Sequence, residues 1–152
     1  FLHKMTLDQW REVLCVDLDS VFNMTRAVIE GMRARSYGRI INIASVNAQK
    51  GQIAQTNYSA AKAGIVGFSK ALALESAAKG ITVNVIAPGY VDTEMVQTVP
   101  EPVLKRIVAE IPVGRLGQAH EIAAAVSYVA HESSGFMTGA TLSINGGQYI
   151  PT

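Results

Sequence analysis

The chain has 152 residues, of which 49% are hydrophobic and 16% charged, which suits one domain with a buried core. Its net charge of +1 excludes a strongly basic surface for nucleic acid or an anionic membrane. One cysteine excludes an internal disulfide, and no apolar run reaches the roughly 18 residues that span a bilayer. We therefore expect a cytoplasmic, soluble protein whose partners are small molecules or other subunits.

The first half of the chain contains two helical patterns separated by a strand pattern. Apolar residues recur at the helical period after Thr6, which predicts one long helix over residues 6–36. The β-branched run "RIINIA", residues 39–44, predicts a strand that is buried on both faces. Residues 57–79 predict a second helix, which Gly80 ends.

The second half continues the alternation. The segment "ITVNVIAPG" predicts a strand followed by a loop, and residues 103–110 predict a short helix. Another helix is predicted to begin near Ala119, and "ATLSING" predicts the last strand. Strands that alternate with helices predict an α/β fold with a three-stranded parallel sheet. Ligands of such sheets bind beyond the carboxyl ends of the strands. No repeat or domain linker is visible.

Polar residues gather where the predicted strands end. Ser45 follows the first strand, and Tyr58 and Lys62 lie four apart near a helix start, so the last two share one helix face. An ammonium beside a phenol favours proton transfer between the phenol and a substrate oxygen, and a serine hydroxyl can stabilise the charge on that oxygen. Tyrosine and lysine at this spacing also occur by chance in many helices.

The surrounding motifs favour the catalytic interpretation. The pattern S-x12-Y-x3-K at Ser45, Tyr58 and Lys62, with "NVIAPGYVDT" and "TGATLSINGG", resembles the short-chain dehydrogenase/reductase family over the whole chain. The resemblance implies a doubly wound Rossmann-type sheet of which this chain is the C-terminal half. It also implies that the serine and tyrosine bind the substrate oxygen, while the lysine holds the nicotinamide ribose and relays protons.

The resemblance implies further cofactor contacts in the loop after the second strand. By matching positions, the cofactor-binding residues are Tyr58, Lys62, Pro88, Gly89, Val91 and Thr93. A physical reason for Gly89 is that a backbone without Cβ can approach a flat ring closely. An ordinary turn is the alternative for Pro88 and Gly89.

Within the family, "GRIINIASVNAQKGQIAQTNYSAAKAG" resembles bacterial acetoacetyl-CoA reductases, NADPH enzymes that supply (R)-3-hydroxybutyryl-CoA for polyhydroxyalkanoate synthesis. The resemblance implies reduction of acetoacetyl-CoA with NADP(H), and an acyl pocket lined by Gln49, Gln52, Ile53, Gln55 and Tyr90. Surface loop amides are the alternative for the glutamines. Ile53 replaces an aromatic residue frequent in that subfamily, which bears on substrate preference.

The sequence departs from the family pattern in two respects. Asp17 occupies the position of an asparagine that anchors a proton-relay water, so we include it among the catalytic residues. Nothing in residues 1–152 matches the glycine-rich turn TGxxxGxG, whose helix start holds the pyrophosphate. We expect residues 1–152 to be the C-terminal part of one NAD(P)-binding domain, and expect no detectable NADPH-dependent reduction of acetoacetyl-CoA by this piece alone.

Both long predicted helices, residues 6–36 and 57–79, carry apolar residues on more than one face, which indicates subunit association. A thick core is the alternative. The resemblance implies a homo-oligomer, a dimer or tetramer, joined through these helices.

Two other functions fit the sequence: a 3-oxoacyl-[acyl-carrier-protein] reductase and a non-catalytic truncated oligomerisation module. The three histidines, His3, His120 and His131, are scattered, so we expect no metal site.

Overall fold

The computed structural model describes residues 1–150, whose centre is a parallel sheet of three strands. The strands are β1 (Gly38–Ile43), β2 (Ile81–Pro88) and β3 (Thr141–Ile144), arranged in the order β1-β2-β3. Parallel neighbours require a crossover between consecutive strands, and helices supply both crossovers here. The predicted α/β fold with a three-stranded parallel sheet is confirmed.

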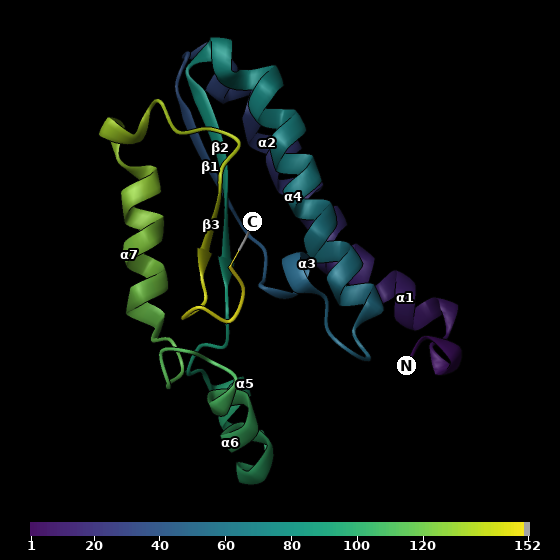
Figure 1. The fold of residues 1–152 in the computed structure, drawn as a ribbon. Helices are drawn as coiled ribbons and strands as arrows, with labels where there is room; N and C mark the ends of the chain where they lie inside the picture. The colour runs from purple at the N-terminus through teal and green to yellow at the C-terminus, as the bar shows by residue number, and fades with distance from the viewer. Residues whose placement is uncertain (151–152) are drawn as a thin grey trace.

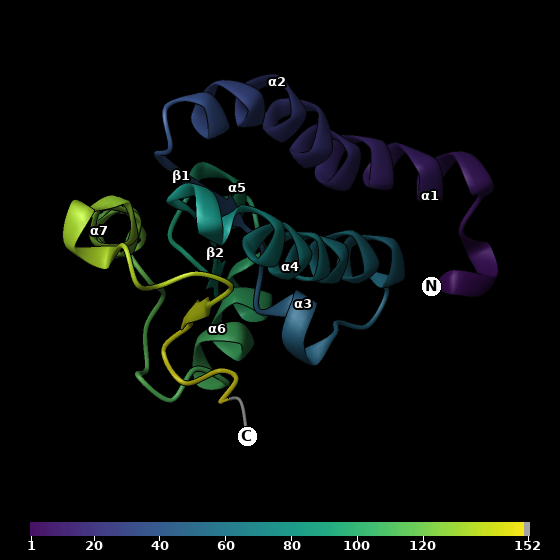
Figure 2. The same cartoon turned by 90° about the horizontal axis from the view of Figure 1, so that it is seen from above.

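Helices cover both faces of the sheet (Figure 1). On one side lie α2 (Ser20–Ala34) and α4 (Thr56–Ser76), and α7 (Ala119–Ala130) lies on the other side. The view from above shows α2 and α4 running side by side, with α7 across the sheet from them (Figure 2). Within residues 1–150, none of the helices combines the length and apolar character needed to cross a lipid bilayer.

The remaining helices are shorter than these three. They are α1 (Leu7–Leu14), α3 (Asn47–Lys50), α5 (Glu94–Gln97) and α6 (Glu101–Ala109), with 3-10 turns η1 (Leu2–Lys4), η3 (Ala77–Lys79) and η4 (Glu132–Ser134). Of these, α3 follows β1, and α5 and α6 follow β2. They therefore gather at the carboxyl end of the sheet (Figure 1).

The core lies between the sheet and the helices α2 and α4. Its first cluster of buried residues comprises Ile40, Ala73, Ile81 and Val83, and its second comprises Ala44, Ile65 and Val85. Strand β2 is buried along nearly its whole length because strands flank it on both sides and helices cover both faces.

Two buried asparagines fix parts of this core through hydrogen bonds. Asn42 Nδ2 donates to Ser69 Oγ over 2.8 Å and ties β1 to α4. Asn84, which is fully buried, donates from Nδ2 to the Met137 carbonyl oxygen over 2.8 Å, and its Oδ1 accepts from the Ala140 N–H over 3.1 Å. Asn84 thereby holds the segment that leads into β3.

The helix predicted over residues 6–36 differs from the structure in its middle. A π-helical turn, η2 (Cys15–Asp19), separates α1 from α2. A π turn contains an extra residue, so it changes the direction of the side chains that it carries, and such turns are frequent at functional sites. The side chain of Asp17 lies on this turn.

Element boundaries differ elsewhere by one or two residues, and the short helices α3 and α5 lie in segments for which the sequence predicted no helix. Strand β1 begins at Gly38, α4 at Thr56 and α6 at Glu101. A helix of four residues is too short to show a helical period in its sequence. The second predicted helix ends in the 3-10 turn η3 before Gly80, whose φ of 66° is left-handed.

Candidate active site

The first turns of α4 carry two of the predicted catalytic side chains. Tyr58 lies in the first turn and Lys62 one turn later, so both point from the same face of the helix. Lys62 Nζ lies 5.6 Å from the centroid of the Tyr58 ring. It also donates a hydrogen bond of 3.4 Å to the Ile43 carbonyl oxygen at the end of β1. The strand end and the helix start are therefore joined through this ammonium group.

Asp17 approaches Lys62 from the π-helical turn η2. Its Oδ1 lies 3.0 Å from Lys62 Nζ, and the side chains of Asp17 and Lys62 are 25% and 14% exposed, respectively. The close packing of η2 on α4 is visible at Gly64, where an added Cβ would lie 2.9 Å from Cδ2 of Leu18. A side chain at position 64 would displace the Leu18 side chain from its present packing on α4.

Ser45 lies just beyond β1, in a segment that continues to pair with β2. The N–H groups of Ala44 and Val46 donate to the carbonyl oxygens of Ile86 and Pro88, each over 2.8 Å. The buried Ser45 lies between these two anchors, and its Oγ accepts from the Asn47 N–H over 3.1 Å. Because Oγ is occupied as an acceptor by a backbone donor, its proton remains available for a substrate oxygen.

The loop after β2 is anchored at two places. The Gly89 N–H donates to the Ile144 carbonyl oxygen over 3.0 Å. Val91 forms a parallel bridge with Gly117, whose N–H donates to the Tyr90 carbonyl oxygen over 2.9 Å. The loop is thus held against β3 on one side and the segment before α7 on the other.

Gly89 has a structural reason within the protein itself. A Cβ at this position would lie 2.9 Å from Cα of Asn145, in the segment after β3. Contacts this short essentially never occur between real Cβ atoms and backbone, so a larger residue would separate the loop from β3. Packing against Asn145 therefore requires the absence of a side chain at Gly89, in addition to the approach to a ring that the sequence suggests.

One cleft of about 670 Å³ brings most of the predicted site residues together. It lies beyond the carboxyl ends of the strands, as expected for a parallel sheet. The predicted residues that line it are Asp17, Ser45, Gln55, Tyr58, Lys62, Gly89, Tyr90, Val91 and Thr93.

Four predicted site residues are not part of the wall of this cleft. Pro88 ends β2, and its carbonyl oxygen accepts from the Val46 N–H. Gln49 Nε2 donates to Ser143 Oγ over 2.9 Å, and Ser143 Oγ donates back to Gln49 Oε1 over 3.1 Å. Gln52 and Ile53 lie in the loop before α4, where the Ile53 side chain is 78% exposed.

Four further residues line the cleft, although the sequence motifs do not single them out. They are Val46, Asn47, Met95 and Val96. The sequence does contain one indication for Asn47: it is a polar residue two positions after Ser45, beyond a strand end where ligands of parallel sheets bind. Met95 and Val96 lie on α5, directly after Thr93, and their apolar side chains carry no such signal.

Tyr90 also borders a second, smaller cavity, together with Arg115 and Glu121. Burial raises the pKa of the Tyr90 hydroxyl, and the negative charge of Glu110 raises it further. Tyr90 is therefore a neutral hydroxyl at physiological pH, able to donate and accept hydrogen bonds.

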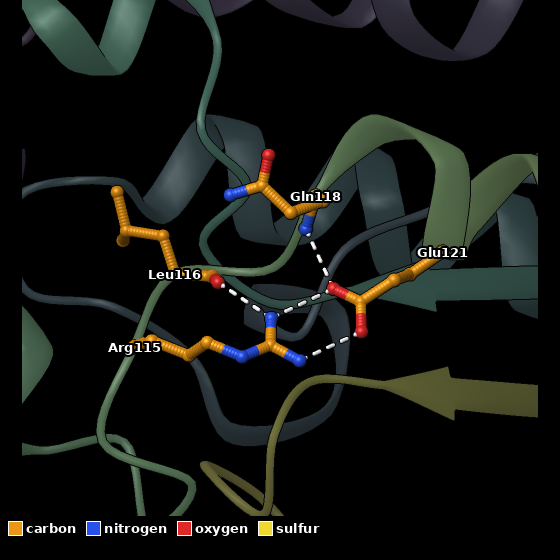
Figure 3. Close-up of polar contacts among 4 residues, drawn as sticks. All are labelled: Arg115, Leu116, Gln118 and Glu121. Carbon is orange, nitrogen blue, oxygen red and sulfur yellow. Dashed lines mark hydrogen bonds and ion pairs between the residues drawn. The ribbon is translucent and has the colours of Figure 1, made fainter.

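The neighbouring ion pair fixes the start of α7 (Figure 3). Arg115 Nη1 and Nη2 donate to the two carboxylate oxygens of Glu121, each over 2.8 Å, and the Gln118 N–H donates to Glu121 Oε2 over 2.8 Å. The hydrogen bonds from Arg115, together with that from Gln118, lower the pKa of Glu121 to about 2. This pair borders the smaller cavity, and its contact with the Gln118 N–H holds the start of α7 in position.

The cleft lining includes groups that could hold one end of a nicotinamide cofactor. The hydroxyl of Tyr58 and the ammonium of Lys62 can hydrogen-bond ribose hydroxyls, and Gly89, Val91 and Thr93 line the same cleft. Among residues 1–150, no group of three or more histidine, cysteine or acidic side chains is arranged to hold a metal ion.

Comparison with known proteins identifies the family. The family model described as enoyl-(acyl carrier protein) reductase matches residues 1–148. An acetoacetyl-CoA reductase of Shinella zoogloeoides is 61% identical over 149 residues, and one of Rhizobium meliloti (strain 1021) is 60% identical over 149 residues. Each alignment covers 97% of this chain and 62% of the relative.

A more distant relative is a 3-oxoacyl-[acyl-carrier-protein] reductase of Pseudomonas aeruginosa, 46% identical over 98% of this chain and 60% of its own length. The chain thus spans less than two thirds of the length of each of these three relatives. With the match over residues 1–148 and identities of up to 61%, the chain belongs to the short-chain dehydrogenase/reductase family.

Proposed function

We propose that the whole protein reduces acetoacetyl-CoA and related 3-oxoacyl-CoA thioesters to (R)-3-hydroxyacyl-CoA with NADPH. The observation that carries this proposal is that Ser45, Tyr58 and Lys62 face one cleft beyond the carboxyl ends of the sheet. The identities of 60% and 61% to two proteins named acetoacetyl-CoA reductase support the substrate class.

The proposed reaction assigns one role to each side chain. The substrate keto oxygen binds between the Ser45 and Tyr58 hydroxyls, and the bound nicotinamide supplies hydride to the keto carbon. Tyr58 acts as general acid and gives its proton to the keto oxygen, while Ser45 stabilises the developing charge with a hydrogen bond. Lys62 stabilises the phenolate that remains, and Asp17 holds the ammonium in place at 3.0 Å.

The remaining predicted residues divide between cofactor and acyl group. We assign the loop residues Pro88, Gly89, Val91 and Thr93 to the nicotinamide end, together with Tyr58 and Lys62. Gln55 and Tyr90 line the cleft and are assigned to the acyl thioester. Gln49, Gln52 and Ile53 come from the same segment between β1 and α4, so we assign them to the outer part of the acyl site.

Steady-state kinetics on the whole protein test this assignment. We expect turnover of acetoacetyl-CoA with NADPH, higher kcat/KM with NADPH than with NADH, and (R)-3-hydroxybutyryl-CoA as the product by chiral chromatography. The 152-residue chain alone serves as a comparison. Its sequence contains no TGxxxGxG turn for the pyrophosphate, so we expect no detectable turnover from it.

A second candidate is reduction of 3-oxoacyl groups carried on acyl carrier protein, which the 46% identity to a carrier-protein reductase supports. Paired kinetics with acetoacetyl-CoA and acetoacetyl-carrier protein separate the two. A higher kcat/KM for the carrier-protein substrate would favour the second candidate. Failure of the whole protein to bind NADPH, measured by fluorescence, would instead favour a non-catalytic oligomerisation module.

We also propose a homo-oligomer, a dimer or tetramer, joined through residues 6–36 and 57–79. The supporting observation is apolar exposure on these helices: Phe22 and Met24 of α2 are 55% and 70% exposed, and Leu74 of α4 is 86% exposed. Surface exposed to this extent favours association. Light scattering on the whole protein gives the subunit number, and a monomer at micromolar concentration would contradict the proposal.

A further inference from the structure

Asn47 occupies a central position in the wall of the cleft. It is the first residue of α3, its side chain is 8% exposed, and it lies between Ser45 and Gln55, which line the same cleft. Buried polar side chains are normally fully hydrogen-bonded. Asn47 Oδ1, however, is buried without a hydrogen-bond partner among residues 1–150. An apolar side chain at position 47 would avoid the free-energy cost of burying an oxygen atom without a hydrogen bond, so the asparagine needs another explanation.

The backbone of Asn47 orients the hydroxyl of Ser45. Its N–H donates to Ser45 Oγ over 3.1 Å. This hydrogen bond uses a lone pair of the hydroxyl oxygen and leaves the O–H as a donor. Ser45 is thereby prepared to donate to a carbonyl oxygen.

The side chain of Asn47 orients the amide of Gln55. Asn47 Nδ2 donates to Gln55 Oε1 over 2.9 Å. A glutamine amide has one acceptor end and one donor end, and here the acceptor end is occupied. The two N–H donors of Gln55 Nε2 are the groups left for a ligand in the cleft. Asn47 thus holds two hydrogen-bond donors, the Ser45 O–H and the Gln55 N–H, on one wall of the cleft.

We propose that Asn47 is a positioning residue that makes this wall selective for a 1,3-dicarbonyl substrate. A 3-oxoacyl thioester has two acceptor oxygens, the ketone oxygen and the thioester carbonyl oxygen, separated by three carbon atoms. Ser45 donates to the ketone oxygen, and Gln55 Nε2 donates to the thioester oxygen. The inference rests on the proposed function, since it assigns the two ends of that substrate to two donors.

The substitution Asn47→Asp tests the role of the donor at Nδ2. The aspartate has nearly the same shape but only accepts hydrogen bonds, so it attracts Gln55 Nε2 and turns the Gln55 acceptor end toward the cleft. We expect KM for acetoacetyl-CoA to rise about tenfold, with kcat changed by less than about threefold, because one hydrogen bond to the substrate is lost. Circular dichroism and thermal unfolding verify that the variant is folded.

A thioether analogue, S-(3-oxobutyl)-CoA, separates this role from a general change of the cleft. It keeps the ketone and the CoA moiety but has a methylene group in place of the thioester carbonyl. We expect its inhibition constant to be the same in the wild type and in Asn47→Asp. Equal weakening of the analogue and of acetoacetyl-CoA would overturn the inference, because an added charge or a distorted cleft affects both.

The variant Gln55→Glu provides an independent measurement, since Gln55 is exposed and its replacement does not disturb the core. It keeps the acceptor for Asn47 Nδ2 and removes the donors that face the cleft. We expect the same rise in KM as in Asn47→Asp. An unchanged KM in Gln55→Glu would contradict the inference, because the Gln55 donors would then not bind the substrate. Absence of acetoacetyl-CoA turnover in the wild type would instead reject the proposed function itself.

Discussion

The carboxylate of Asp17 lies 3.0 Å from the Nζ atom of Lys62, and this ion pair joins the π-helical turn η2 to the face of α4 that carries Tyr58. Both side chains are largely shielded from water, so the interaction is screened less than an ion pair on the surface. The negative charge of Asp17 opposes the effect of the Lys62 ammonium on the neighbouring Tyr58 phenol. The pair therefore controls the charge next to the proposed proton donor.

We predict that Asp17→Ala lowers kcat for ketone reduction by about threefold to tenfold, because Lys62 Nζ loses the carboxylate that holds it from 3.0 Å away. The measurement is steady-state kinetics on the whole protein with acetoacetyl-CoA and saturating NADPH. Asp19→Ala, an exposed change in the same turn, is the matched control and leaves kcat unchanged. A wild-type kcat in Asp17→Ala would show that the ion pair has no part in the reaction.

We predict that Tyr58→Phe lowers kcat by about 10²- to 10⁴-fold, because it removes the proposed general acid. The ring remains in place, so NADPH affinity, measured by fluorescence titration, changes by less than about threefold. Tyr128→Phe is the control, since Tyr128 lies exposed on α7 outside the cleft. Wild-type turnover in Tyr58→Phe would exclude Tyr58 as the proton donor.

We predict that Asn84→Ala lowers the free energy of unfolding by about 1–3 kcal/mol, because it leaves the Met137 carbonyl oxygen and the Ala140 N–H without their buried partner. Urea denaturation provides the measurement. Lys105→Ala, which removes an exposed ion pair with Glu101, is the control and changes the stability by less than about 1 kcal/mol. A stability loss at Asn84 no larger than the control would mean that water replaces both hydrogen bonds.

We predict that the contribution of Glu121 to stability disappears in acid. In the folded protein, the hydrogen bonds from Arg115 and Gln118 lower the pKa of Glu121 from 4.5 to about 2. A lowered folded-state pKa means that the stabilisation is complete above pH 4.5 and is lost as the pH falls toward 2. The melting temperature of Glu121→Gln should therefore be below that of the wild type at neutral pH, and the difference should vanish near pH 2. A difference that stays constant from pH 7 to pH 2 would contradict this account.

The strands and long helices could be predicted from the sequence because their patterns are local. The run "RIINIA" and the apolar run after Gly80 carry enough β-branched residues to identify two strands of the sheet. The π turn at Cys15–Asp19 could not be predicted, since a single extra residue per turn hardly alters an apolar period. The four-residue helices α3 and α5 were missed because little more than one turn is too short for an apolar position to recur at the helical period.

By itself, the sequence determined that Ser45, Tyr58 and Lys62 lie at strand ends and on one helix face, and their proposed catalytic roles rest on the resemblance of their S-x12-Y-x3-K spacing to the short-chain dehydrogenase/reductase motif. Only the tertiary structure decided which other polar side chains belong with them. It places Asn47 and Gln55 together in the cleft lining, joined by a hydrogen bond, whereas Gln49 bonds Ser143 and is not part of that lining. The physical reason is that a hydrogen bond depends on distances and directions of a few ångströms, and packing of η2, α3, β3 and α4 sets these only once the chain has folded.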